Sequence, residues 1–176
     1  MKKSKKVAFC SLIVALSCAV MLATRLFTTL SYACGAIAGL FIITIVLEYG
    51  NKWALVSYFA AAILSVLFAS ADAAIVYVLL FGYYPILKGL IEGKISSYPL
   101  QWGIKVVYFN IVMVACYYLI VAIVGPFDDL DMLGKFALPI MALICNAAFI
   151  IYDVGTTKII SGYNYLLRPR IHKIMK

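Results

Sequence analysis

Long apolar stretches, separated by short segments with polar residues, glycine or proline, dominate the pattern of the chain. A run of about 20 apolar residues is long enough to cross the hydrocarbon core of a bilayer as an α-helix. Such runs predict membrane-spanning helices at residues 7–30, 32–47, 53–69, 73–91, 104–124 and 136–160. The pattern therefore predicts an all-α integral membrane protein, a bundle of six transmembrane helices that forms a single domain over residues 1–176, with no soluble domain.

The segments between the apolar runs carry residues that favour turns or helix starts. Asp72 directly precedes the fourth run, and its carboxylate is predicted to cap the helix of that run. A Gly-Pro step at residues 125–126 ends the fifth run, and three aspartates follow it at residues 128–131. Two readings of this acidic loop stay open: a solvated external turn, or part of a lid over a cavity.

Composition excludes the soluble classes of protein. Of the 176 residues, 66% are hydrophobic and only 12% are charged. A soluble domain of this size buries about 70% of its unfolded surface and needs polar residues for the remainder. A soluble enzyme, a disordered chain and a secreted disulfide scaffold are therefore excluded, whereas apolar surface that faces lipid fits these numbers.

The distribution of charge predicts the orientation in the membrane. Lys and Arg outnumber Asp and Glu by 15 to 7, which gives a formal net charge of +8. With the N-terminus inside the cell, all basic residues except Arg25 and Lys135 fall on the cytoplasmic side of the predicted spans. The positive-inside rule then places both termini in the cytoplasm, and the basic excess needs no nucleic acid partner.

No motif of nucleotide, metal or nucleophilic chemistry occurs in the sequence. There is no P-loop, GxGxxG or HExxH, the five cysteines form no CxxC pair, and the single histidine is His172. We therefore expect no catalytic residues, no metal and no cofactor, so the chain is predicted to be a non-enzymatic subunit. If it transports actively, the energy must come from partner chains or from an ion gradient.

Polar residues within three consecutive spans share helical faces. Residues 77, 84 and 88 lie on one face of the fourth run, residues 110 and 117 on one face of the fifth, and residues 146 and 153 on one face of the sixth. Because a polar group in hydrocarbon is costly, such residues usually face the bundle interior. We therefore expect a common cavity, with substrate bound in its outer half by Asp72, Tyr77, Tyr117, Tyr118 and Asn146.

The inner half of these spans is predicted to hold a polar pair of Lys88 and Asp153. A structural ion pair near the cytoplasmic face, between Asp153 and either Lys88 or Lys105, is the alternative. Asn146 could equally join two helices by hydrogen bonds. The tyrosines near span ends are expected to form interfacial belts: Tyr32, Tyr49, Tyr58, Tyr163 and Tyr165.

Small residues form rows on the first two spans. Ala15, Ala19 and Ala23 repeat at intervals of four on the first span, and Gly35 and Gly39 do so on the second. Such rows allow a second helix to approach closely, so that van der Waals contact drives association in lipid. Packing within the chain and docking of a partner chain both remain open.

The size, the six spans and the row Ala15-xxx-Ala19-xxx-Ala23 resemble the substrate-binding (S) subunits of energy-coupling-factor (ECF) transporters. In that family the alanine row on the first helix docks onto a membrane T subunit, and two cytoplasmic ATPases supply the energy. The resemblance implies a partner-docking role for these three alanines. It also implies uptake of a vitamin or its precursor across the bacterial cytoplasmic (plasma) membrane, with substrate bound near the external face.

A six-span scaffold of a cell-envelope complex, which binds partners and transports nothing, is the alternative function. A sealed bundle without a cavity would favour it. A membrane enzyme is a third class, but it would need catalytic groups clustered at one depth, and the scattered acids and lone histidine argue against it.

Overall fold

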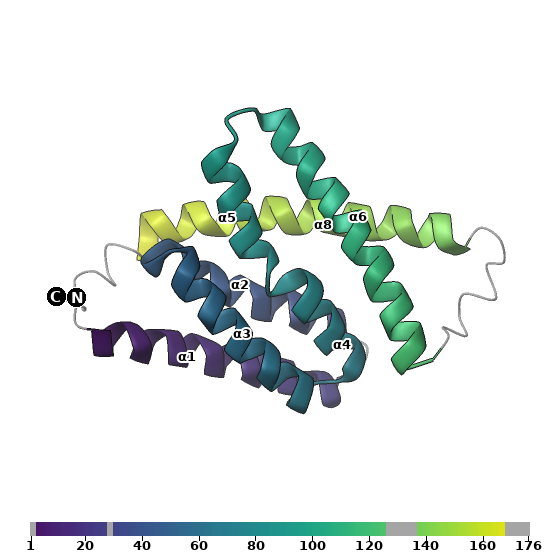
Figure 1. Ribbon diagram of the computed structural model, residues 1–176, viewed down its shortest axis with the longest axis horizontal. Helices are drawn as coiled ribbons and strands as arrows, with labels where there is room; N and C mark the ends of the chain where they lie inside the picture. Colours follow the sequence, from purple (N-terminus) through teal and green to yellow (C-terminus); the bar gives the residue numbers. More distant parts are fainter. Residues whose placement is uncertain (1–2, 28–29, 126–136, 168–176) are drawn as a thin grey trace. The chain divides into compact units, whose positions relative to one another are not determined.

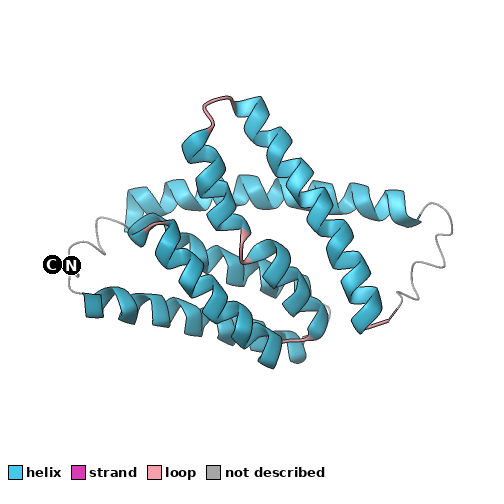
Figure 2. Cartoon of the chain, in the orientation of Figure 1, coloured by secondary structure: helices cyan, strands magenta, loops and turns pink. Residues whose placement is uncertain are grey.

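The computed structural model describes residues 3–27, 30–125 and 137–167, and the regular structure in these residues is helical (Figure 2). Six helices in this described part are long and apolar enough to cross a membrane. They are Lys3–Arg25, Ser31–Tyr49, Asn51–Phe68, Ala71–Lys94, Tyr98–Ile123 and Pro139–Tyr165. Within the described residues, the prediction of helical structure with six helices long and apolar enough to cross a membrane is confirmed, whereas the crossing itself and the side that holds the termini stay predictions.

The chain divides into two compact units, Met1–Gly134 and Lys135–Lys176, and each is described by itself. The second unit contains α8 (Ala137–Gly162) and a π-helical turn, η5 (Tyr163–Leu167). The first unit contains α1 (Lys3–Leu22), η1 (Ala23–Arg25), α2 (Ser31–Tyr49), α3 (Asn51–Phe68), α4 (Ala71–Val76), η3 (Tyr77–Phe81), α5 (Tyr84–Lys94) and α6 (Tyr98–Ile123). The acidic loop at residues 128–131 lies outside the described residues.

The helices α1, α2 and α3 pack side by side in the first unit (Figure 1). Buried residues recur every three or four positions along α1, at Cys10, Ile13, Ser17 and Met21, so one stripe of this helix faces its neighbours. The facing positions on α2 and α3 include alanines that are almost fully buried. Small side chains bring the helix backbones close together, which is how helices gain van der Waals contact in lipid.

Hydrogen bonds tie the end of α1 to the turn between α3 and α4. The hydroxyl of Thr24 donates to the carbonyl of Met21 at 2.6 Å and accepts the backbone N–H of Ser70 at 3.0 Å. Next to it, Nε of Arg25 donates to the carbonyl of Phe68 at 2.9 Å. The first helix was predicted to reach residue 30, but it ends at Arg25, where these side chains bind another part of the chain.

The fourth span is not the single regular helix that the sequence pattern predicts. It begins as α4, passes through the π-helical turn η3, is interrupted at residues 82–83 and resumes as α5 (Figures 1 and 2). Pro85 explains the interruption, because it has no N–H to donate to the carbonyl of Phe81, the acceptor four residues earlier. The ring of a proline also crowds that carbonyl, so the helix bends away.

Candidate functional site

Side chains from two neighbouring helices bind the backbone of the broken fourth span. The hydroxyl of Tyr58, from α3, donates to the carbonyl of Val78 at 2.6 Å. The hydroxyl of Tyr108, from α6, donates to the carbonyl of Leu79 at 3.0 Å. These two side chains replace backbone donors that the break has removed, which is the usual requirement for irregular backbone at membrane depth.

Gly39 on α2 lies directly against the carbonyl of Phe81 in the break. A Cβ at this position would overlap the carbonyl oxygen of Phe81 and would lie 2.8 Å from its carbonyl carbon. Glycine is therefore the residue that allows α2 to lie against the fourth span here. At Gly35 an added Cβ would lie 3.3 Å from the ring of Phe81, so the row Gly35-xxx-Gly39 serves packing within the chain.

Tyr58 was predicted to belong to an interfacial belt, and that prediction is wrong. Its side chain is only 7% exposed and lies in the core of the first unit, with its hydroxyl bound to the fourth span. The ring of Tyr83 stands between those of Tyr58 and Tyr108, with centroid distances of 6.0 Å and 6.4 Å. Tilted aromatic pairs of this kind add packing energy beyond burial alone, so these tyrosines form a structural cluster around the break.

Tyr77, predicted to stack on the substrate, lies in the core of the first unit. It is fully buried in a cluster that includes Met21 of α1, Ala38 of α2 and Ala61 of α3. Its hydroxyl is buried and has no hydrogen-bond partner in the described part of the chain. In this conformation Tyr77 packs in the core, and its contact with a substrate stays a prediction.

The tyrosine pair on α6 occupies a different environment. The rings of Tyr117 and Tyr118 meet edge to face at 5.6 Å. Tyr118 is 68% exposed, whereas Tyr77 is completely covered. The structure therefore does not bring Tyr77 and Tyr118 to one surface. The sequence places all three tyrosines by depth, and depth alone does not fix the direction in which a side chain points.

Asp72 lies half-buried in the first turn of α4, two residues after the N-cap residue Ser70. Neither residue makes a side-chain capping hydrogen bond, so the prediction that Asp72 caps this helix is wrong. A carboxylate in the first turn still gains from the helix dipole. The preceding Ser70 is bound to Thr24 of η1, the short segment that also carries Arg25.

The two polar residues predicted on the sixth span both lie on α8, in the second unit. The side-chain amide of Asn146 donates to the carbonyl of Ala142 at 2.8 Å, one turn earlier. The hydroxyl of Thr157 donates to the backbone carbonyl of Asp153 at 3.0 Å. The predicted common site of Asn146 with the tyrosines of α6 and the predicted pair of Asp153 with Lys88 remain predictions.

An ion cluster joins α5 and α6. Nζ of Lys88 lies 3.1 Å from Oε1 of Glu92, and Nζ of Lys105 lies 2.6 Å from the same oxygen. The lysine side chains are 1% and 3% exposed, and that of Glu92 is 35% exposed. Nζ of Lys105 also lies 5.7 Å from the ring centre of Trp102, a cation–π contact.

Sequence reasoning missed Glu92, although a signal was present. Lys88 and Glu92 are four residues apart, the spacing at which side chains of opposite charge meet on a helix. The residue lies just beyond the end predicted for the fourth span at 91, whereas α5 continues to Lys94. Had the predicted fourth span been one turn longer, it would have placed the carboxylate of Glu92 beside Lys88.

The alanine row on α1 lies opposite the buried face of that helix. Ala15 and Ala19 are exposed and Ala23 is half-buried, whereas the stripe from Cys10 to Thr24 faces α2 and α3. At about 100° per residue, the row is centred on the side of α1 that points away from these neighbours. The structure therefore does not pack this alanine row against α2 or α3 of the first unit.

Within the described residues there is no group of three or more His, Cys, Asp or Glu side chains that could hold a metal ion. Comparison with known protein families, with curated proteins and with solved structures finds no match to the chain.

Proposed function

We propose that the chain is the membrane-embedded substrate-binding subunit of an ATP-driven importer of the ECF class, with a vitamin or vitamin precursor as its substrate. In this role it captures a small molecule from outside the cell. A membrane T subunit and cytoplasmic ATPases bind the chain and supply the energy. The chain itself is non-enzymatic and resides in the bacterial cytoplasmic membrane with both termini inside.

The observation that carries this proposal is the exposed alanine face of α1. Ala15 and Ala19 present little side chain, so a partner helix can approach the backbone of α1 closely along this row. Lipid alone does not require small residues, because larger apolar side chains face it equally well, as Leu12 and Leu16 do beside the row. A helix of a partner subunit explains why alanines recur here.

The substrate site in this proposal lies toward the external face. Tyr117 and Tyr118 contact the flat part of the nutrient, Asn146 orients it by hydrogen bonds, and Asp72 favours a positive group. Tyr77 supports the fourth span from the core instead of contacting substrate. Transport requires that the affinity for substrate differ between two states of the chain, and the partner subunits must drive the exchange between them.

A membrane scaffold without transport activity is the second candidate, and one observation favours it. Two of the expected ligand residues do not share a surface: Tyr77 is fully buried and Tyr118 is 68% exposed. A scaffold would use the same exposed face of α1 to bind a partner and would need no substrate site. The identity of the partner separates the two functions.

Replacing Ala19 by leucine is expected to prevent assembly with the T and ATPase subunits, because the larger side chain fills the space that a docking helix would occupy. Binding of the substrate by the isolated subunit should be unchanged, since Ala19 lies on the exposed face of α1. Affinity purification of the tagged chain from membranes that contain all subunits measures the assembly.

The matched control is Ala60→Leu, the same change at an exposed position of α3. It should leave co-purification as in the wild type, because α3 carries no docking row in this proposal. Equal recovery of the T and ATPase subunits with Ala19→Leu and with Ala60→Leu would remove the alanine face from the docking surface. Recovery of cell-envelope proteins in place of ATPases would favour the scaffold.

A further inference from the structure

The break in the fourth span has an unusual distribution of hydrogen bonds. The backbone N–H of Gly82 donates to the carbonyl of Tyr77 at 2.7 Å, five residues earlier, where an α-helix would use the carbonyl of Val78. The carbonyl of Val78 instead accepts the hydroxyl of Tyr58, and that of Leu79 accepts the hydroxyl of Tyr108. Side chains from two other helices thus hold backbone acceptors of this span.

A second arrangement of the same segment uses the same groups. If the hydroxyl of Tyr58 moves away, the carbonyl of Val78 becomes available to the N–H of Gly82, and the π-helical turn becomes α-helical. The N–H of Gly82 exchanges its bond to Tyr77 for one to Val78, so no backbone donor is lost, and the hydrogen bond of the Tyr58 hydroxyl is given up. An α-helical turn closes its hydrogen bond over one residue fewer than a π-helical turn. The change therefore rotates α4 relative to α5 by one residue step, about 100°, and shifts it by about 1.5 Å along the helix axis.

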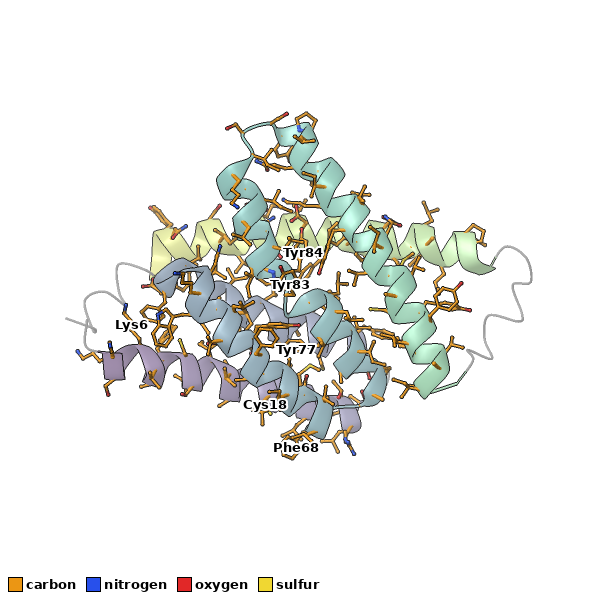
Figure 3. All side chains as sticks on the ribbon, viewed as in Figure 1. Lys6, Cys18, Phe68, Tyr77, Tyr83 and Tyr84 are labelled. Carbon is orange, nitrogen blue, oxygen red and sulfur yellow. The ribbon has the colours of Figure 1, made fainter. Side chains whose placement is uncertain are left out.

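The neighbouring residues keep the segment from becoming one regular helix. Pro85 has no N–H for the carbonyl of Phe81, so a discontinuity persists in both arrangements. At Gly82 an added Cβ would lie 2.9 Å from the ring of Tyr58, so glycine is what allows this ring to reach its acceptor. Figure 3 shows Tyr77, Tyr83 and Tyr84 placed along this part of the span.

The described arrangement also carries a local cost. The hydroxyl of Tyr77, the first residue of the π turn, is buried and makes no hydrogen bond in the part of the chain that the structure describes. A buried polar group without a partner is unfavourable. Rotation of α4 would carry Tyr77 out of this environment. The unpartnered hydroxyl of Tyr77 therefore disfavours the described arrangement, whereas the hydrogen bonds of Tyr58 and Tyr108 stabilise it.

We propose that residues 77–83 form a hinge at which α4 changes register against α5, and that the hydroxyls of Tyr58 and Tyr108 latch the hinge in the described state. The inference rests on the broken span alone and holds whether the chain is a transporter or a scaffold. It gives the first unit a two-state element inside the membrane, which is what coupling between the two sides of a membrane protein requires.

Hydrogen exchange of the full-length chain in nanodiscs, followed by mass spectrometry, tests the hinge. In the double variant Tyr58→Phe, Tyr108→Phe, the amides of residues 82–84 should exchange about tenfold faster than in the wild type, because the two hydrogen bonds that oppose opening of the hinge are lost and the N–H of Gly82 is released each time it passes between the carbonyls of Tyr77 and Val78. Amides of α1 and α2 should keep their wild-type rates. The single variants should each give a smaller acceleration at the same residues.

The matched control is Tyr118→Phe, which removes an exposed hydroxyl from α6 and should leave residues 82–84 unchanged. If residues 82–84 of a folded double variant exchange at the wild-type rate, the two tyrosine hydroxyls do not latch the hinge. Equal acceleration in all helices would also overturn the latch, because it would indicate general destabilisation. If the double variant fails to fold, the single variants decide in the same way.

Discussion

Gly39→Ala is expected to lower the free energy of unfolding by about 3 kcal/mol, among the largest effects of any single methyl group in this chain. The added Cβ overlaps the carbonyl oxygen of Phe81 and lies 2.8 Å from its carbonyl carbon. These are backbone atoms of the broken span, so the overlap is relieved only if α2 and the fourth span separate. Thermal unfolding of the detergent-purified chain, with the yield of monodisperse protein, measures the loss.

Gly103→Ala is the control for this substitution. It makes the same change within α6, where no atom lies within 4 Å of an added Cβ. It should be neutral or stabilising by up to about 1 kcal/mol, because alanine favours the helix more than glycine does. If both variants unfold at the same temperature, α2 does not contact the fourth span as described.

Glu92→Gln should cost about 3 kcal/mol, the second large effect, because it removes the negative charge that Lys88 and Lys105 share. Both lysine side chains are almost completely buried, so water cannot replace the carboxylate. Lys105→Met should cost less, since it leaves a carboxylate that is 35% exposed and still paired with Lys88. Thermal unfolding of the two variants under the same conditions shows which substitution lowers the stability more.

Lys94→Met serves as the control, because this lysine lies at the exposed end of the same helix. It should change the unfolding temperature little, as exposed charges usually do. A Glu92→Gln protein as stable as Lys94→Met would show that the shared carboxylate does not hold α5 to α6. If Lys105→Met lowers the unfolding temperature more than Glu92→Gln does, the expectation that the buried lysines depend most on the shared carboxylate is wrong.

The number and placement of the spans could be predicted because hydropathy is a property of each segment alone. Apolar runs predicted six spans, and six helices of suitable length and hydropathy occur in the described residues. The predicted ends of the spans were less accurate, since the residue at which a helix ends depends on contacts with residues distant in the sequence. The first helix ends at Arg25, well before the predicted 30, and the side chains of Thr24 and Arg25 there bind the turn that follows α3.

The broken fourth span could not be read from hydropathy, because its apolar pattern continues through the break. Pro85 and Gly82 were available as signals, but whether a helix breaks near a proline depends on what satisfies the carbonyls that lack backbone donors along the break. Here the donors are Tyr58 and Tyr108, which lie 20 and 29 residues away from their acceptors in the sequence. Only the packed structure brings them together.

For a related reason, the sequence predicts which helix carries each candidate residue but not the direction in which its side chain points. Spacing of four residues placed Ala15 and Ala19 on one face of α1, and this face is exposed. The proposed ligand residues were grouped by depth along different spans, and depth does not determine whether side chains converge. Tyr77, on the expected helix and at the expected depth, points into the core.

Native mass spectrometry of the tagged chain, released from membranes of its own cells, tests most directly whether it is the substrate-binding subunit of an ATP-driven importer. The expected spectrum contains the chain with one small molecule bound, and a larger assembly that adds a membrane protein and two ATPases. A spectrum in which the chain carries no small molecule and associates only with proteins that do not hydrolyse ATP would contradict this account.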